Sequence, residues 1–267
     1  MLSDAARRTD PIAQAHLLAG FFAVCATGCS GMPELEREEA RAAERARSEL
    51  VAFMSLETMF PEPRLRALAR AAGRGNVRRI DALVREGVDV NGRGTSGAVP
   101  LFWAMHDIRG FRRLLELGAD PNAVFEDGGS VMHWAVTLEN PEFLEALLEH
   151  GADPNLRAGA GDRTPLFDVI LHDLEDRVPI LLEAGANIDA RDAVGWTPVM
   201  EAASNEQFDL VYDLLQRGAD YTATTSSGVD LADVIAFSHR NMKSCDEMTD
   251  WRHRVTVWLE RRGVETE

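Results

Sequence analysis

The sequence predicts an all-α solenoid, in which helix-turn-helix units with hairpin-like finger loops stack into one elongated domain. The main observation is a glycine that recurs at steps of 31, 33, 34 and 33 residues, at Gly87, Gly118, Gly151, Gly185 and Gly218. Each glycine lies in a similar hexapeptide, of which Leu-Gly-Ala-Asp-Pro-Asn at 117–122 is typical. A period of this size indicates stacked supersecondary units that share a long exposed surface. The pattern therefore favours binding over catalysis.

The segment that ends at Gly218 shows why each unit is expected to contain two helices. Thr197 supplies a capping hydroxyl, and Pro198 stands at the first helical position, where a missing amide costs nothing. A second helix is expected where apolar residues follow at helical spacing, namely at Val211, Leu214 and Leu215. Gly218 then ends this helix by adopting the left-handed conformation.

The start of the first helix carries a motif that resembles the ankyrin repeat family. The family's Thr-Pro-Leu-His-x-Ala-Ala is echoed in Ser130-Val131-Met132-His133-Trp134-Ala135, in Thr164-Pro165-Leu166-Phe167 and in Thr197-Pro198-Val199-Met200. The resemblance covers residues 62–267 and implies about five ankyrin repeats followed by a C-terminal cap. By the same resemblance, His133 serves the hydrogen bonding of its own repeat.

Three local departures from the repeat pattern are expected to change the structure. The second repeat is two residues short near Gly110, so its interhelical loop should be tight. Pro179 falls early in a second helix, where the amides lack partners and proline is tolerated. The last unit has about twelve extra residues between Ser238 and Trp251, which form either a capping loop or a second contact surface.

Residues 1–28 are expected to form a lipoprotein-like signal peptide. An apolar run at 17–26 follows Arg7 and Arg8 and is too short to span a bilayer. Ala26-Thr27-Gly28-Cys29 resembles the bacterial lipobox, which implies that Cys29 is lipidated, and Ser30 is compatible with sorting to the outer membrane. Ala26 departs from the leucine that this pattern prefers. The alternatives are an ordinary buried helix in a cytoplasmic protein and a cleaved or misassigned start.

Residues 29–61 would then comprise the lipidated cysteine and a charged helical tether, since strong helix formers alternate with charges from Glu34 to Glu49. Loss of Cys25 with the signal would leave Cys245 without a partner, so no disulfide framework is expected.

Composition and motifs argue against several classes of function. The net charge of -16 argues against a phosphate-binding surface, and so against a nucleic-acid partner, and weakly favours a basic partner, although simple solubility explains it as well. Gly92-Arg93-Gly94-Thr95-Ser96-Gly97 fits a nucleotide-binding pattern, but it follows a helix end rather than a strand. The histidines show no metal-ligand spacing. We therefore expect no metal, no cofactor and no enzymatic activity.

In ankyrin proteins, partners lie against the finger turns and the exposed part of each first helix, which assigns a partner-binding surface here. The turn residues so implied are Phe125, Glu126, Arg163, Ala193, Val194 and Trp196. The helix residues are His106, Asp107, Thr137, Leu138, Leu171, His172, Ser204 and Asn205. Trp196 is the expected anchor, because aromatic residues dominate interface energetics, with packing on its own repeat as the alternative. Trp103 and Trp134 are expected to lie in the core.

A narrower resemblance concerns function. The signal, the tether and the segments 100–104, 130–135 and 143–144 resemble bacterial ankyrin lipoproteins encoded beside type VI secretion lipase effectors. That resemblance implies an immunity protein, a monomer when unbound, that neutralises a phospholipase effector in the periplasm and touches the membrane only through its lipid anchor. The alternatives are a periplasmic scaffold or stress-protection protein, and a cytoplasmic ankyrin adaptor.

Overall fold

The computed structural model describes residues 55–126, 128–159, 161–241 and 246–265. Leu56–Glu267 form one compact unit. The predicted signal peptide, the lipidation site Cys29 and the charged tether lie outside the described residues.

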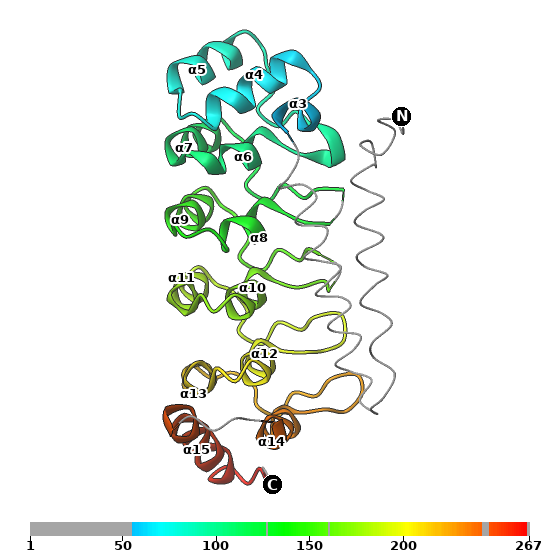
Figure 1. The fold of residues 1–267 in the computed structure, drawn as a ribbon, viewed down its shortest axis with the longest axis vertical. Helices are drawn as coiled ribbons and strands as arrows, with labels where there is room; N and C mark the ends of the chain where they lie inside the picture. The colour runs from blue at the N-terminus through cyan, green and yellow to red at the C-terminus, as the bar shows by residue number, and fades with distance from the viewer. Residues whose placement is uncertain (1–54, 127, 160, 242–245, 266–267) are drawn as a thin grey trace, which may run out of the picture. The chain divides into compact units, whose positions relative to one another are not determined.

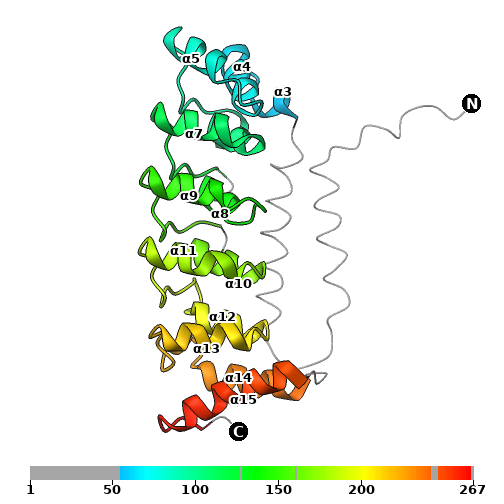
Figure 2. The ribbon, with the colours of Figure 1, turned by 90° about the vertical axis from the view of Figure 1, so that its left-hand side faces the viewer.

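The described residues form a stack of helix pairs arranged in two columns, as the sequence predicts (Figures 1 and 2). The inner column contains α4 (Pro63–Ala72), α6 (Pro100–Trp103), α8 (Val131–Ala135), α10 (Pro165–Leu171), α12 (Pro198–Ser204) and α14 (Leu231–Asn241). The outer column contains α5 (Val77–Arg85), α7 (Ile108–Glu116), α9 (Glu142–Glu149), α11 (Val178–Glu183), α13 (Phe208–Gln216) and α15 (Asp246–Glu260). Short helices α3 (Leu56–Met59), η1 (Thr95–Gly97), η2 (Ala104–His106) and η3 (Glu175–Arg177) complete the fold.

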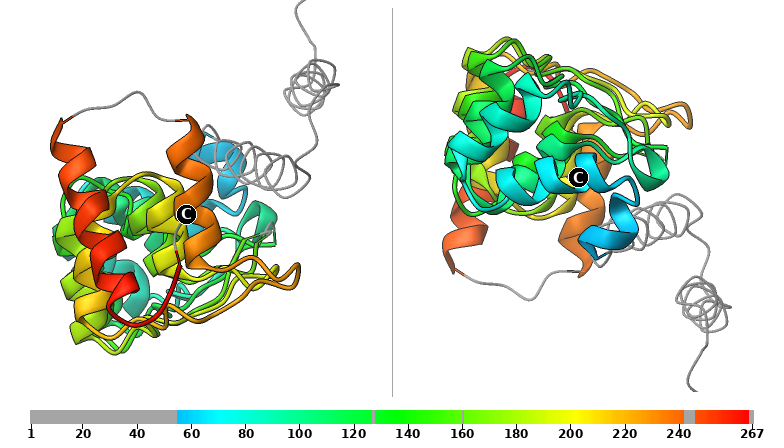
Figure 3. Two further views of the ribbon diagram at one scale, coloured as in Figure 1. Left: turned by 90° about the horizontal axis from the view of Figure 1, so that it is seen from below. Right: turned by 90° about the horizontal axis from the view of Figure 1, so that it is seen from above.

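Finger loops project from the same side of every helix pair, which is clearest along the stack axis (Figure 3). Their β-structure is limited, in the described residues, to the isolated bridges Val124–Ser130 and Ala158–Arg163. Neighbouring fingers are joined by backbone hydrogen bonds, from Glu126 N to Ser96 O, Gly159 N to Gly128 O, Ala193 N to Gly161 O, and Ser226 N to Val194 O. Each finger is therefore held by the finger next to it.

The five recurring glycines end the outer helices in the left-handed conformation, which confirms the prediction. Their φ angles lie between 82° and 97°. A Cβ built on any of them would meet no atom within 4 Å. The glycines are needed for backbone conformation and not for close packing.

The last residue of each of the first four hexapeptides has a role that the sequence did not reveal. Asn155 accepts a hydrogen bond from Asn187 N at 2.6 Å and donates one to Gly185 O at 3.0 Å, so it links its repeat to the next. The same relay uses Asn91 with Gly118 O and Asp120 N, Asn122 with Asp153 N, and Asp189 with Asp220 N. We call these contacts the asparagine relay; they satisfy loop amides that would otherwise depend on water.

One expectation about helix caps needs correction. Thr197 occupies the N-cap of α12, but its hydroxyl makes no capping bond, whereas Ser130 Oγ accepts from His133 N and pairs with His133 Nδ1 at 2.7 Å. Where α8 has this histidine, α12 has Met200, whose side chain has no nitrogen to pair with the Thr197 hydroxyl. The compact unit begins at Leu56, and Phe60 near its start is fully buried.

The departures from the repeat pattern appear where the sequence places them. In the second repeat the inner helix is only four residues long and passes through η2 into α7. Pro179 stands in the first turn of α11. Most of the insertion before Trp251 extends α14 and α15 instead of forming a loop. None of the helices in the described residues is long and apolar enough to cross a membrane.

Candidate partner-binding surface

One position of the repeat forms a row along the inner helices. It stands two residues after the buried apolar residue at the leucine position of the motif, and its occupants are Arg70, Trp103, Trp134, Asp168 and Glu201. Arg70 is exposed, both tryptophans are half-buried, and both acids are buried. We call this set the inner row. From the first repeat to the fifth it consists of a cation, two aromatic rings and two buried carboxylates.

Trp103 lines an open pocket at the first two repeats. The pocket has a volume of about 450 Å³ and is lined by Leu56, Glu57, Arg70, Gly73, Arg74, Trp103 and His106. The indole lies where a side chain on Gly73 would otherwise be, since a Cβ there would come within 2.7 Å of Trp103 Cδ1. On its other side the His106 ring lies 4.7 Å away, centroid to centroid. Trp103 is thus positioned by packing while keeping part of its surface open.

Trp134 continues the aromatic part of the row in the third repeat. Its ring contacts Phe102 edge-to-face at 5.5 Å between centroids, and Phe102 contacts Phe125 of the finger loop at 5.1 Å. The Thr137 hydroxyl donates to Trp134 O at 2.9 Å. Edge-to-face packing of this kind fixes ring orientation, which reduces the entropy lost when a partner binds.

Arg163, from the finger loop of the fourth repeat, covers the C-terminal part of the row. Its Nη2 lies 3.4 Å from Asp192 Oδ2 and 3.6 Å from Glu201 Oε2. Its guanidinium lies 5.4 Å from the centroid of the Phe167 ring. All three charged side chains are at most 6% exposed. A long cation thus covers carboxylates that would otherwise face solvent.

Asp168 belongs to the same buried cluster, but the positive charge of Arg163 only partly offsets the effect of burial on it. Burial raises the pKa of Asp168 from 3.8 to about 7; the positive charge of Arg163 opposes this rise and the negative charge of Glu201 adds to it. Near neutral pH a substantial fraction of Asp168 is therefore protonated.

Three of the largest side chains expected at the binding surface are not exposed. Trp196 is 5% exposed, because its backbone closes the finger turn onto Asp192 and returns the indole to the repeat. Phe125 is 4% exposed and packs on Phe102. Arg163 forms buried ion pairs with Asp192 and Glu201. Their expected exposure is wrong, since each turn folds its large side chain inward.

The other predicted residues lie at the surface but in separate places. Glu126, Ala193 and Val194 are exposed on finger loops, and His106 and His172 are exposed at inner-helix ends. The half-buried residues are Asp107, Thr137, Leu138, Leu171, Ser204 and Asn205. Of the exposed and half-buried residues, His106 packs against Trp103. Asp107 caps α7, and Leu138 O accepts a hydrogen bond from Arg177.

Trp103 and Trp134 are the residues that sequence reasoning missed. They were expected in the core, yet both are half-buried at the surface. The signal was available: each occupies the unspecified place in the Thr-Pro-Leu-His-x-Ala motif, where the fold requires no particular side chain. A partly exposed tryptophan at such a position is a candidate for contact with a partner.

Known proteins share this architecture. Models of "Ankyrin repeats (3 copies)" match residues 68–158 and 132–225, which together cover more than half of the chain. Protein PhlB of Serratia liquefaciens is 34% identical over 139 residues, which are 51% of this chain and 61% of that protein. The chain thus spans less than two thirds of this relative's length.

Two solved structures show the same fold. The ankyrin repeat domain of Bcl-3 has a TM-score of 0.58 at 26% identity, with 67% of this chain and 86% of that chain covered. A chain from the complex of the predatory endopeptidase Bd0816 with the immunity protein Bd3460 of Bdellovibrio bacteriovorus has a TM-score of 0.58 at 20% identity, with coverages of 70% and 97%. The chain belongs to the ankyrin repeat family, and its helix stack is a protein-interaction module.

Proposed function

We propose that this chain is an immunity protein, which binds a toxic phospholipase effector of type VI secretion through its inner row and blocks access to the enzyme. The inner row carries the proposal: Trp103 and Trp134 are half-buried and held in place by His106 and Phe102. Preformed aromatic anchors of this kind contribute most of the binding energy in many interfaces.

Charge supports a basic partner surface. The chain carries a net charge of -16, and long-range attraction accelerates encounter with a partner of opposite charge. Inhibition by occlusion requires no chemistry from the binding protein.

The comparisons supply a precedent for the fold. In the Bdellovibrio bacteriovorus complex, an immunity protein is bound to a predatory endopeptidase. At 20% identity this likeness concerns architecture alone, so the phospholipase target rests on the sequence resemblance to the ankyrin lipoproteins. The proposed location is the periplasm, with the domain attached to the outer membrane through a lipidated Cys29.

The decisive experiment pairs this chain with the lipase-like effector that the proposal requires beside its gene. We expect bacteria that produce the effector in the periplasm to survive only when the chain is also produced. Trp103→Ala and Trp134→Ala should each weaken the purified complex by about tenfold or more, which matches the usual loss at an aromatic anchor.

Trp251→Ala is the matched control, because Trp251 is also half-buried but lies on α15 of the outer column. It should leave affinity and protection unchanged. Binding without protection would favour the scaffold alternative, and equal affinity in all three variants would remove the inner row as the site.

The anchor is tested separately by mass spectrometry of the mature N-terminus. A diacylglyceryl group on Cys29 is expected. A free Met1 or an unmodified Cys29 would contradict the lipoprotein proposal and favour a cytoplasmic adaptor, while leaving the binding experiment intact.

A further inference from the structure

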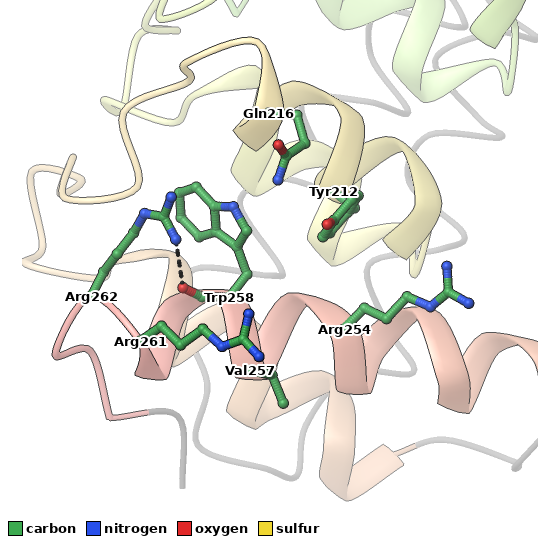
Figure 4. Close-up of a pocket in the computed structure, with 7 residues that line it drawn as sticks. All are labelled: Tyr212, Gln216, Arg254, Val257, Trp258, Arg261 and Arg262. Carbon is green, nitrogen blue, oxygen red and sulfur yellow. Dashed lines mark hydrogen bonds between the residues drawn. The ribbon is translucent and has the colours of Figure 1, made fainter.

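A second pocket lies at the C-terminal end of the stack, between the outer helices α13 and α15 (Figure 4). Its volume is about 400 Å³, and it is lined by Tyr212, Gln216, Arg254, Val257, Trp258, Arg261 and Arg262. Figure 4 shows Tyr212 and Gln216 on α13, facing the arginines and Trp258 of the last helix and its end. The lining contains three arginines and no carboxylate.

Arg262 is held in place by an aromatic ring. Its guanidinium carbon lies 3.4 Å from the centroid of the Trp258 ring, and its Nη1 donates to Trp258 O at 3.1 Å (Figure 4). Trp258 is itself fixed by Tyr221, whose ring meets it edge-to-face at 5.4 Å. A stacked guanidinium keeps the N–H groups at its edge available to an anion.

The other two arginines add charge at the same opening. Arg254 lies over Trp251, 4.4 Å from the ring centroid, and pairs with Asp250 at 2.9 Å. Arg261 is exposed, and its side chain makes no hydrogen bond or ion pair with another described residue. Such a concentration of cations is unusual in a chain whose net charge is -16.

We propose that this pocket binds a phosphate group. A phosphate presents several equivalent oxygens, so it can accept hydrogen bonds from more than one guanidinium at once, and arginine forks match this geometry. Arg254 is already paired with Asp250, so Arg261 and Arg262 are the two cations left to share one anion. The aromatic walls formed by Tyr212 and Trp258 suit a small organic group attached to the phosphate.

Two classes of ligand carry such a phosphate group: anionic phospholipids, in their headgroups, and free phosphate compounds. The site is separate from the inner row, because it lies between outer helices at the opposite end of the stack from the Trp103 pocket (Figures 1 and 4). The pocket is therefore accessible whether or not a protein is bound at the inner row.

The test is a titration of the full chain with inorganic phosphate, in which NMR spectra monitor the indole N–H resonance of Trp258. We expect saturable shifts confined to α13 and α15, with millimolar affinity. Arg261→Gln with Arg262→Gln should weaken binding by about tenfold or more, because two charge-assisted donors are lost. Arg261→Gln alone should weaken it by a smaller factor and keeps the Arg262 stack, so it reports on binding if the double variant folds poorly.

Arg112→Gln is the matched control, since Arg112 is an arginine paired with Glu149 on the helices of other repeats. It removes the same charge and should leave phosphate affinity unchanged. Identical affinities in the pocket variants and the control, or equal shifts with chloride at the same ionic strength, would overturn the proposal.

Vesicle co-sedimentation then distinguishes the two sources. Binding to phosphatidylglycerol vesicles but not to phosphatidylcholine vesicles, lost with Arg261→Gln, would assign the site to a lipid headgroup. Phosphate binding without vesicle binding would assign it to a free phosphate compound.

Discussion

Arg163 covers the carboxylates at the C-terminal end of the inner row. Its guanidinium lies within 3.6 Å of two carboxylates and within 5.4 Å of the Phe167 ring centroid. With one cation facing Asp168, Asp192 and Glu201, full ionisation would leave the buried cluster with excess negative charge. Protonation of Asp168 is the least costly way to reduce that excess.

Asp168→Asn should therefore change how stability depends on pH. Because burial raises the pKa of Asp168 from 3.8 to about 7, the folded protein holds a proton that the unfolded chain releases above pH 3.8. The contribution of Asp168 is most favourable below that pH, falls as the pH rises towards 7, and is constant above it. Urea unfolding from pH 4 to 8 should show the variant gaining a few kcal/mol on the wild type, since one pKa unit is worth ~1.4 kcal/mol.

The control for this prediction is Asp176→Asn, which changes an exposed carboxylate in η3. Its stability should follow the wild-type curve at every pH. Parallel curves for Asp168→Asn and the wild type would show that Asp168 is ionised in the folded protein.

Trp196 and Trp103 should respond to truncation in different ways. Trp196→Ala removes an indole that is 5% exposed and should cost about 3–5 kcal/mol of unfolding free energy. Trp103→Ala removes a half-buried ring at an open pocket and should cost roughly half as much. Chemical denaturation followed by circular dichroism measures both, and equal losses would contradict the burial difference.

The finger loops were predictable from the sequence, but the burial of their large side chains was not. Burial of Trp196 depends on a turn in which Gly195 adopts a φ of 85° and Asp192 accepts from Val194 and Trp196 amides. Such a turn is a three-dimensional property that periodicity does not encode. The positions of Trp103 and Trp134 were readable, because both occupy the unspecified place of the motif.

At the scale of the elements, the second repeat shows how a shorter loop is accommodated. Gly110 in α7 approaches the first repeat so closely that a Cβ would lie 1.9 Å from Ala72 O. A backbone carbonyl is unable to rotate away as a side chain does, so only glycine permits this contact.

Gly110→Ala should be far more damaging than a substitution at a helix-ending glycine. We expect a loss of about 3 kcal/mol or more, because α7 must move away from α4. Gly118→Ala, with a φ of 90° and no atom near the added Cβ, should cost about 1 kcal/mol from backbone strain alone. Thermal unfolding of both variants measures the contrast, and a smaller loss at Gly110 would contradict the close approach.

At the scale of the whole molecule, the stack is held by contacts between adjacent repeats. The helix pairs, their order and the glycine ends were predictable, because periodicity of apolar residues reports directly on packing. The hydrogen bonds between repeats were not, since an asparagine in a loop has the same sequence signature whether it bonds its own turn or the next one.

Asn155→Ala should weaken the coupling between two repeats. The change removes the bonds to Asn187 N and Gly185 O and should cost about 1–2 kcal/mol, since both bonds are near solvent. Thr222→Ala is the control, because Thr222 holds the same place in the last hexapeptide and bonds only within its own turn, to Asp220. Urea unfolding should show a lower midpoint for the first variant, and equal midpoints would contradict a linking role.

The asparagine relay also gives the stack a direction. In every case the side chain belongs to the earlier repeat and the backbone groups to the later one, as with Asn91 and Asp120, or Asp189 and Asp220. During synthesis, each newly made repeat meets a side chain already in position to bind its loop. Growth from the N-terminus therefore extends an existing template, whereas removing the first repeat would leave the amide of the next without its acceptor.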